Sequence, residues 1–360
     1  MKYKYANLIV AYGSNLCSRD FDAYAQRHGE TGSCLQFEEV IVIPDHKLAF
    51  NVSSKTRSGG VLNLEYAKGF VTYGVLFSAN DVGLNLVRRK EGVPYKYEEV
   101  KIAAIRRDGS EVEAMTYIVP TAKTENFVEP SASYLSICME GYKEYCLDTF
   151  DIQDAAENKA LEPAPALFCY GTLMRGESRF HIIKNHGVSC AIMALGFGSL
   201  STDGSYPALH TQSNGVVFGD YFVSENIGSL LDETDAIEGF YGFGNKNNLF
   251  RRTYIDVDVG GLGQRGAWVY VMDTILSVQV LEKGWREHND RHLEFLSEVI
   301  DAHAKGTPDF DMEVRSNLYR YAPNPPSQFS KSEMTDMLSD FTLLTERHLA
   351  QVSGLWTALT

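Results

Sequence analysis

The chain has 360 residues, of which 44% are hydrophobic and 22% charged, a composition typical of soluble globular proteins. This length exceeds what one hydrophobic core usually supports, so it predicts two domains with additional elements. The formal net charge of −14 disfavours sequence-independent binding to nucleic acid or to an anionic membrane surface, because like charges repel. We therefore expect neither nucleic acid nor membrane among the partners.

Hydropathy and cysteine usage point to one compartment. No apolar run reaches the roughly 18 residues of a membrane-spanning helix, and the short apolar stretch near the start lacks a signal-peptidase site. The six cysteines show no CxxC spacing, as expected of reduced thiols. Together these features predict a cytoplasmic protein.

Strands and turns alternate through the first part of the chain. The apolar segment NLIVAY runs into the turn Tyr12-Gly13-Ser14-Asn15. Further strands are predicted in four β-prone segments, at 39–43, 47–52, 61–66 and 70–77. Ser78 is predicted to cap a helix that ends at Glu91-Gly92, and YEEVKIAAI and EVEAMTYIV complete the strands.

A helix and a linker follow this first unit. Residues 130–150 carry apolar side chains at helical spacing. Residues 151–165 are polar and end in two prolines, which is typical of a linker.

The first pattern then starts again. The strand ALFCY leads into the turn Tyr170-Gly171-Thr172-Leu173, and GVVFGDYFV is a later strand. Ser224 is predicted to cap a helix that ends at Glu238-Gly239, and RRTYIDVDV and GAWVYVM close the set. Turn, strand, helix and Glu-Gly recur in the same order at similar spacing, with differences that loop variation can absorb. We interpret this as a tandem duplication of one α+β unit.

The pattern becomes helical after Met272. Leu281 and Trp285 begin an apolar face, and SKSE at 330–333 has the form of a capping box. The sequence thus predicts four parts: a first domain at 1–150, a linker at 151–165, a second domain at 166–274 and a helical extension at 275–360.

Each repeat offers a glycine-containing turn after a buried strand and one carboxylate at a helix end. Successive backbone N–H groups in such a turn form a concavity for a substrate carboxylate or a developing oxyanion. Glu91 and Glu238, if desolvated among aromatic side chains, acquire a raised pKa and suit proton transfer. Taken alone, such a turn is mostly just a turn, and a glutamate before glycine is usually a solvated helix end. Their joint recurrence raises the expectation of a function to about that of the ordinary explanation, and the pairing fits acyl transfer without a protein nucleophile.

Other candidate sites have weaker support from the sequence. His288 and His292 are spaced i, i+4 in the predicted tail helix, but no third ligand accompanies them, so no metal is expected. The chain has no nucleophile-elbow, phosphate-loop or dinucleotide-binding motif. No histidine recurs at a matched position near Cys17 and Cys169, which disfavours cysteine catalysis.

Both repeats resemble one enzyme family. Most of residues 5–149 is similar to gamma-glutamylcyclotransferase in the segments AYGSN, SGGVLNL, YGVLF, KEGV and PSASYLSICMEGYKEYCL. Residues 166–272 resemble the gamma-glutamylamine cyclotransferase branch in FCYGTLMRG, YPAL, GVVFGDYFV, IEGF and FRRTYIDV. The resemblance implies an α+β fold: two tandem mixed β-barrels, here followed by the helical extension.

The resemblance also implies a cofactor-free cyclisation related to glutathione metabolism. The α-amino nitrogen of a small gamma-glutamyl substrate attacks its own γ-carbonyl, which gives 5-oxoproline and a free amine; proximity supplies much of the rate. By position, Glu91 and Glu238 match the general acid/base of the family. The two turns match its substrate-binding loop: Tyr12, Gly13, Ser14 and Asn15, and Tyr170, Gly171, Thr172 and Leu173.

Two further points bear on function. The first turn carries Asn15 where the second carries Leu173, and only the second turn is followed by Arg175. We therefore expect the first repeat to prefer gamma-glutamyl-α-amino acids and the second to prefer gamma-glutamyl amines. Neither Tyr95 nor Tyr97, which follow Glu91, can be matched to a family tyrosine.

The alternative is a non-catalytic or half-catalytic binding or adaptor protein, in which one or both barrels only recognise a gamma-glutamyl or carboxylate ligand. A glutamate in both repeats favours catalysis, because a binder of an anionic ligand gains nothing from a buried carboxylate.

Overall fold

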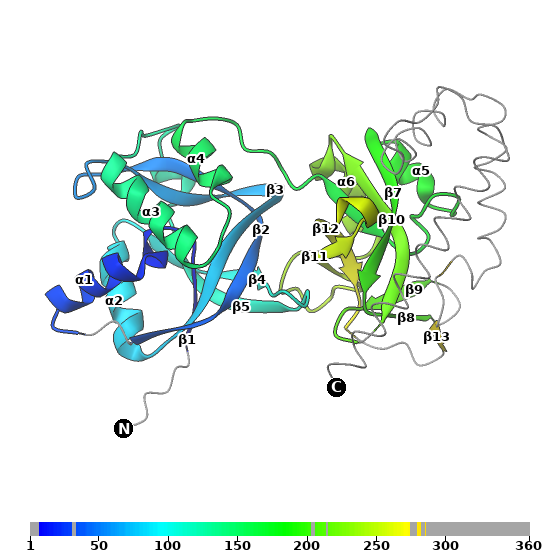
Figure 1. Ribbon diagram of the computed structural model, residues 1–360, viewed down its shortest axis with the longest axis horizontal. Coiled ribbons are helices and arrows are strands. Elements are labelled where there is room, and N and C mark those ends of the chain that lie inside the picture. The colour runs from blue at the N-terminus through cyan, green and yellow to red at the C-terminus, as the bar shows by residue number, and fades with distance from the viewer. Residues whose placement is uncertain are drawn as a thin grey trace. The chain divides into compact units, whose positions relative to one another are not determined.

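A computed structural model describes residues 7–30, 34–202, 206–213, 215–273, 279–281 and 285. The chain divides into two compact units: Met1–Pro165 with Ile227–Ile255, and Ala166–Asn226 with the residues from Asp256 onward. Two closed barrels of five strands each are present (Figure 1). The predicted α+β fold with two mixed β-barrels is therefore confirmed.

The first barrel has the strand order β1-β3-β2-β4-β5. Its strands are β1 (Asn7–Ala11), β2 (Leu35–Ser54), β3 (Gly59–Ala79), β4 (Glu98–Ile105) and β5 (Glu111–Ile118). Neighbouring strands are antiparallel except at the closure, where β1 pairs in parallel with β5 and Ile9 is aligned with Met115.

The four strands predicted between residues 39 and 77 are two long strands, β2 and β3, paired as one hairpin. The expected break after Ile43 is a bulge: the register shifts between Pro44 and His46, and Asp45 has φ 54°. The Asp45 carboxylate accepts a hydrogen bond from the N–H of Gly69 on β3 at 2.9 Å. Because the side chain satisfies this N–H, the hairpin bends without ending.

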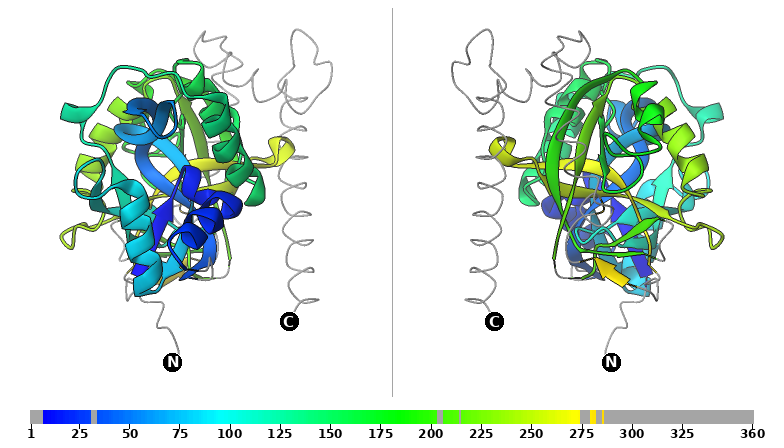
Figure 2. Two further views of the ribbon diagram at one scale, coloured as in Figure 1. Left: turned by 90° about the vertical axis from the view of Figure 1, so that its left-hand side faces the viewer. Right: turned by 90° about the vertical axis from the view of Figure 1, so that its right-hand side faces the viewer.

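The described residues up to Pro165 also form the helices α1 (Ser18–Arg27), α2 (Asp81–Glu91), α3 (Ala132–Glu144) and α4 (Phe150–Ala156). Two 3₁₀ turns lie at Ser14–Leu16 (η1) and Thr121–Lys123 (η3). Figure 2, left, shows the unit from the side of α1 (blue) and α2 (cyan). The segment predicted as a linker from residue 151 thus begins with most of α4.

The predicted end of α2 is confirmed, but its predicted cap is wrong. Ser78 is a buried residue of β3, and the cap is Asn80, whose side chain accepts a hydrogen bond from Gly83 N–H. The strand runs two residues further than expected, so the capping position moves with it. Gly92 ends the helix with φ 69°, a left-handed conformation that glycine adopts without strain.

The second barrel has the order β10-β6-β12-β11-β7. Its strands are β6 (Ala166–Cys169), β7 (Val188–Phe197), β10 (Val216–Ser224), β11 (Arg251–Asp258) and β12 (Gln264–Val271). It too closes through one parallel pair, β12 with β6. Helices α5 (Phe180–Lys184) and α6 (Ile227–Ile237) and the 3₁₀ turn η4 (Gly260–Leu262) belong to this part of the sequence.

A separate three-stranded sheet has the order β13-β8-β9, from Gln279–Leu281, Ser199–Thr202 and Pro207–His210. The expectation that Leu281 begins a helical face is therefore wrong at that residue, which pairs with Leu200 in an antiparallel ladder. Apart from β13 and Trp285, the predicted helical extension lies outside the described residues.

A glycine occupies the same place in both barrels. An ideal Cβ on Gly74 of β3 would lie 2.7 Å from the carbonyl oxygen of Ala11, and one on Gly219 of β10 would overlap the carbonyl oxygen of Cys169. Ala11 and Cys169 each immediately precede the tyrosine of a turn. The two glycines thus let the strand that leads into each turn approach its neighbour closely.

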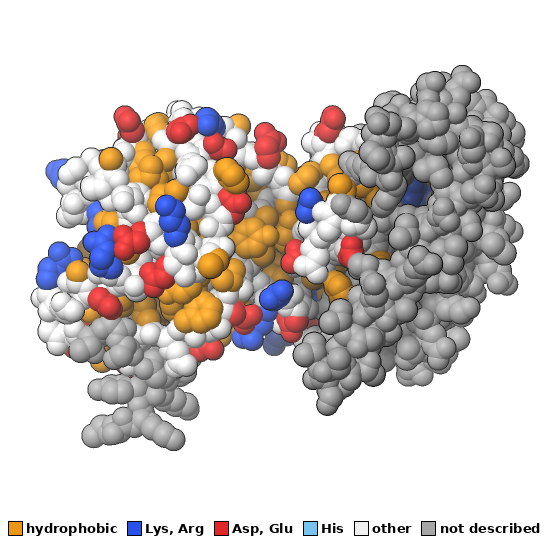
Figure 3. Space-filling model, viewed as in Figure 1, with side chains coloured by type: hydrophobic (Ala, Val, Ile, Leu, Met, Phe, Trp, Pro, Cys, Tyr) orange, Lys and Arg blue, Asp and Glu red, His pale blue; other side chains and the backbone are white. Residues whose placement is uncertain are grey.

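Acidic and basic side chains are interspersed over the described part of the face in Figure 3. No disulfide joins any of the six cysteines, all of which lie in described segments. Among the described helices, none is long and apolar enough to cross a membrane.

Candidate active site

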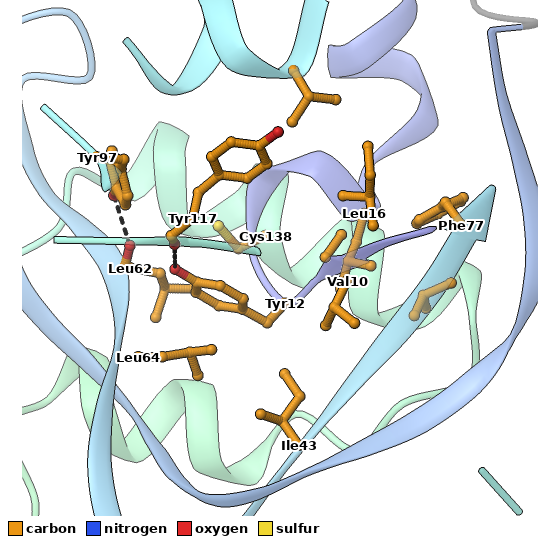
Figure 4. Close-up of a cluster of buried hydrophobic side chains, with 14 of the residues drawn as sticks. Val10, Tyr12, Leu16, Ile43, Leu62, Leu64, Phe77, Tyr97, Tyr117 and Cys138 are labelled. Atoms are coloured by element: carbon orange, nitrogen blue, oxygen red, sulfur yellow. Dashed lines mark hydrogen bonds between the residues drawn. The ribbon is translucent and has the colours of Figure 1, made fainter. Parts of the chain in front are cut away.

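The first turn is held on the barrel by tyrosine hydroxyls. Tyr12 follows β1, and its hydroxyl donates to the carbonyl oxygen of Tyr117 on β5 at 2.5 Å (Figure 4). Tyr142 of α3 donates to the carbonyl oxygen of Tyr12 at 3.0 Å. The next residues form η1, in which Leu16 N–H bonds Gly13 O at 2.9 Å. The predicted turn is therefore fixed to β5 and α3.

The second turn carries the same anchor. Tyr170 follows β6 and donates to the carbonyl oxygen of Tyr270 on β12 at 2.6 Å. In each repeat one aligned residue pair fixes the register of the two parallel strands. Counted from that pair, the tyrosine lies three residues further along the chain, and the accepting carbonyl lies two residues further along the partner strand. This agreement in register supports the repeat interpretation independently of sequence letters.

Glu91 is the last residue of α2. Gly92 N–H bonds Arg89 O at 3.2 Å and Val93 N–H bonds Arg88 O at 3.0 Å, which closes the helix end. Here Glu91 meets the turn: its Oε1 accepts a hydrogen bond from Asn15 Nδ2 at 2.6 Å. The structure thus brings together the carboxylate and the turn that the sequence selected.

A small cavity of about 30 Å³ lies against Glu91 and the turn. Its lining combines turn backbone with aromatic side chains: Val10, Ala11, Tyr12, Gly13, Ser14, Asn15, Leu62, Glu91, Tyr97, Tyr117 and Tyr134. Tyr97 donates to Leu62 O at 2.8 Å, and Leu62 N–H donates to the Tyr134 hydroxyl at 3.4 Å (Figure 4 labels Tyr97 and Leu62). The aromatic wall is held by backbone groups of β3.

Burial raises the pKa of Glu91, and the nearby Lys90 and Asn15 offset this only in part. Glu91 is half-buried by exposed area, but its carboxylate faces the tyrosine-lined cavity. Burial also raises the pKa of Tyr97 and Tyr134 well above the ordinary range. The site therefore combines neutral hydroxyls with one carboxylate that binds a proton more readily than a solvated glutamate, as proton transfer requires.

Charged side chains lie behind Asn15. Lys90 Nζ is 2.9 Å from Asn15 Oδ1 and 2.9 Å from Asp20 Oδ2. Asp20 also accepts two hydrogen bonds from Arg57, at 2.8 and 3.2 Å. Although burial opposes it, pairing with Arg57 and Lys90 lowers the pKa of Asp20 to about 2.

Glu238 occupies the corresponding place in its own helix end. It follows α6 and is half-buried, and Gly239 after it has φ 63°. Phe240 N–H bonds Asp235 O at 2.8 Å, the same closing bond that Val93 makes in the first repeat. The second turn also repeats a local bond, Met174 N–H to Gly171 O at 2.9 Å.

The second turn is more crowded than the first. A Cβ on Gly171 would lie 2.6 Å from Pro207 Cγ, whereas one on Gly13 would lie 3.6 Å from Leu62. Arg175 is 9% exposed and forms an ion pair with fully buried Asp220 of β10 at 2.8 Å. Arg175 therefore supports the barrel.

No group of three or more metal-ligating side chains occurs among the residues described here. His288 and His292 lie outside them.

Sequence reasoning missed most of the supporting residues. Of the two tyrosines that the sequence analysis left unassigned, Tyr97 lines the cavity and Tyr95 is 89% exposed. Tyr117 and Tyr134 lie far from the turn in sequence and carried no motif. For Lys90, adjacency to Glu91 was the only available signal.

Comparison with known proteins finds matches to one enzyme family. Residues 167–289 match the family model described as gamma-glutamyl cyclotransferase, AIG2-like. The chain is 28% identical over 138 residues to the gamma-L-glutamyl-butirosin B gamma-glutamyl cyclotransferase of Niallia circulans, covering 38% of this chain and 85% of the relative. It is 29% identical over 163 residues to the gamma-glutamylcyclotransferase of Homo sapiens, and the match covers 43% of this chain and 79% of that relative.

Among solved structures, a gamma-glutamyl cyclotransferase is 26% identical, with a TM-score of 0.36, over 44% of this chain and 88% of its own. Residues 167–289 therefore match the gamma-glutamyl cyclotransferase, AIG2-like family model, and the chain is similar to two proteins named as gamma-glutamyl cyclotransferases.

Proposed function

We propose that this protein is a cyclotransferase that converts gamma-glutamyl amino acids or gamma-glutamyl amines to 5-oxoproline and a free amine. The observation that carries the proposal is the 2.6 Å hydrogen bond between Asn15 and Glu91 beside a tyrosine-lined cavity. It joins a buried carboxylate to a turn of backbone N–H groups, the two parts that the reaction needs. The homologues named above support the same enzyme class.

In the proposed mechanism the turn from Gly13 to Asn15 binds the glutamyl group and holds it folded. The α-amino nitrogen attacks the γ-carbonyl carbon, and a new C–N bond closes the five-membered ring. Glu91 accepts the proton that this nitrogen loses and delivers it to the nitrogen of the departing amine as the amide bond breaks. Atoms and charges balance without a cofactor, and ring closure within one substrate supplies the proximity.

We extend the proposal to the second repeat, with Glu238 as its acid/base and the turn from Tyr170 to Leu173 as its substrate loop. The shared tyrosine anchor and helix-ending bonds support this extension. Because Leu173 is apolar where Asn15 is polar, the second site would favour gamma-glutamyl amines with an apolar stem and the first gamma-glutamyl-α-amino acids. The reacting group is shared, so discrimination would be about 1–3 kcal/mol.

The competing function is recognition of a gamma-glutamyl or carboxylate ligand without turnover. Burial of Glu91 disfavours it, because an anionic ligand gains no affinity from a carboxylate in its pocket.

The test uses the full chain, with 5-oxoproline detected by mass after incubation with gamma-glutamyl-α-amino acids and with gamma-glutamyl-lysine. Glu91→Gln and Glu238→Gln should each lower turnover of one substrate type by ~10²–10⁴-fold, because the amide cannot carry the proton. Glu113→Gln, at an exposed position on β5, is the matched control. Wild-type rates in the double variant on every accepted substrate would refute the assignment, and binding without any 5-oxoproline would favour recognition alone.

A further inference from the structure

Lys90 lies beneath the turn with its charge turned inward. Its side chain is 6% exposed. Nζ is 2.9 Å from Asn15 Oδ1, 3.5 Å from Ser14 O and 2.9 Å from Asp20 Oδ2. Keeping an ammonium group this far from solvent is costly unless partners compensate, and here the partners are the turn and one carboxylate.

The contact with Lys90 determines which way the Asn15 amide faces. An ammonium group only donates hydrogen bonds, so the amide must present its oxygen to Lys90. The amide nitrogen is then directed at Glu91, where Nδ2 lies 2.6 Å from Oε1. An N–H donor favours the ionised carboxylate and occupies one of its oxygens, which leaves Oε2 to receive a proton.

Asp20 and Arg57 hold Lys90 in this position. Asp20 of α1 pairs with Lys90 and, through two hydrogen bonds, with Arg57 at the end of the β2–β3 hairpin. The Lys90 ammonium also lies 5.6 Å from the ring centroid of Phe21. The Arg57 guanidinium lies 5.4 Å from the ring centroid of Tyr134, a residue of the cavity wall.

The second repeat lacks both members of this pair. Counting from the turn tyrosines, the counterpart of Asn15 is Leu173; counting from the Glu-Gly helix ends, the counterpart of Lys90 is Ile237. Both are apolar and cannot form such a contact through their side chains. The two positions are far apart in sequence, yet they are polar together in one repeat and apolar together in the other, as expected of residues that act as a unit.

We propose that Lys90 is a positioning residue: it orients the Asn15 amide so that Glu91 is held as an ionised, single-oxygen acceptor for the proton of the substrate. The inference rests on the proposed role of Glu91. Without Lys90, the amide is free to turn over and offer its oxygen to protonated Glu91, which stabilises the wrong protonation state. Lys90 thus acts on proton transfer, and the turn backbone retains substrate binding.

Several groups other than Lys90 also face Glu91 and affect its pKa. Lys96, after α2, and Arg57, on the hairpin, both favour the ionised form. The hydroxyls around the carboxylate come from the turn after β1, from α1, from the segment before β4, from β5 and from α3: Tyr12, Tyr24, Tyr97, Tyr117 and Tyr134. All of them remain in a Lys90 variant, so a change in titration reports the loss of Lys90 and of the amide orientation.

The experiment compares Lys90→Met, Lys90→Arg and the control Lys101→Met in the full chain. Lys101 is an exposed lysine of β4 paired with Glu113, so its substitution removes the same charge away from the site. We expect Lys90→Met to lower kcat on gamma-glutamyl-α-amino acids by roughly 10-fold with little change in KM. The acidic limb of its pH profile should move up by about one pH unit, since an opposite charge is lost nearby. Lys90→Arg should retain most of the wild-type kcat and most of the wild-type position of the acidic limb. Lys101→Met should match wild type in both measurements.

Two further measurements separate this inference from the proposed function. The first is titration of ¹³C-carboxyl-labelled glutamate by NMR, with the Glu91 signal assigned by its absence in Glu91→Gln. The Glu91 pKa should rise in Lys90→Met even if no substrate is ever turned over. The second is a double-mutant cycle: in an Asn15→Leu background, Lys90→Met should change kcat much less than in wild type.

An unchanged Glu91 titration and pH limb in folded Lys90→Met would overturn the proposal. A raised KM alone would also overturn it, since Lys90 would then bind substrate. If Lys90→Met does not fold, Lys90→Gln replaces it, with the same expected shifts. Wild-type protein without turnover would refute the proposed function, while the NMR titration would still decide the role of Lys90.

Discussion

Removing the carboxylate of Asp20 should destabilise the first unit. Asp20 is the only carboxylate that pairs with both Lys90 and Arg57 within the described residues, at 2.9 and 2.8 Å. The side chain is 13% exposed, so solvent screens these contacts weakly. Asp20→Asn keeps the shape but leaves two cations facing a neutral amide.

The pKa of Asp20 gives the magnitude. It is about 2 in the folded protein against 3.8 for an unperturbed aspartate. Each pKa unit corresponds to about 1.4 kcal/mol, so ionised Asp20 contributes roughly 2 kcal/mol to the free energy of unfolding. Because the folded-state pKa is the lower one, this contribution is fully present above the unfolded-state value and is lost as the pH falls towards 2. Roughly half should remain near pH 3.

The assay has to report on the first unit specifically. All three tryptophans lie at position 268 or later, so tryptophan fluorescence is unsuitable. Hydrogen exchange of the α1 and α2 amides in increasing denaturant gives the local free energy of unfolding. The control is Asp22→Asn, on an exposed position of the same helix.

We expect the free energy of unfolding of Asp20→Asn to be about 2 kcal/mol lower than that of Asp22→Asn at neutral pH. This difference between the two variants should narrow below about pH 4. Equal stabilities at neutral pH, or a gap that widens on acidification, would refute the reasoning.

Four other substitutions have definite expected outcomes. Because burial raises its pKa, ionised Glu91 costs stability, so Glu91→Gln should melt above wild type at pH 8, and this advantage should vanish below the unfolded-state pKa near 4.5. Calorimetric scans at both pH values check it. Gly219→Ala should destabilise by about 1–3 kcal/mol in chemical denaturation, because its Cβ overlaps backbone; a neutral effect would show that β6 can move aside. Gly13→Val should stay folded, as the circular dichroism spectrum will show, but raise KM sharply; unchanged calorimetric affinity for substrate would argue against the turn. Gly171→Val should also lose stability, because Pro207 crowds it.

The sequence predicted well wherever one short segment carries the whole signal. The turn at Tyr12, the helix end at Glu91 and their recurrence in the second repeat each depend on a few adjacent residues. Backbone chemistry alone decides such features: a glycine with φ near +65° ends the helix in both repeats. The resemblance to a known family then placed the carboxylate and the turn in one site.

The sequence predicted poorly wherever a distant contact changes a local preference. Pro44 and Asp45 looked like the end of a strand, and only the bond from Gly69 to the Asp45 carboxylate shows why the strand continues. Ser78 and Asn80 are both suitable caps, and the length of β3 decides between them. The cavity tyrosines lie at four separate places in the chain, two in loops, one in β5 and one in α3, so no single window of sequence contains them.

The tyrosine anchors have a consequence for how each barrel is made. Tyr12 bonds a carbonyl 105 residues later in the chain, and Tyr170 one 100 residues later. The same span separates the strands whose parallel pairing closes each barrel. During synthesis the first turn therefore emerges long before the strand that anchors it. The entropy cost of closing so long a loop comes before the stabilising contacts that barrel closure provides. A ribosome-bound chain that ends before β5 should carry the complete YGSN sequence without the rigid turn, and acquire that turn only once Tyr117 has left the exit tunnel.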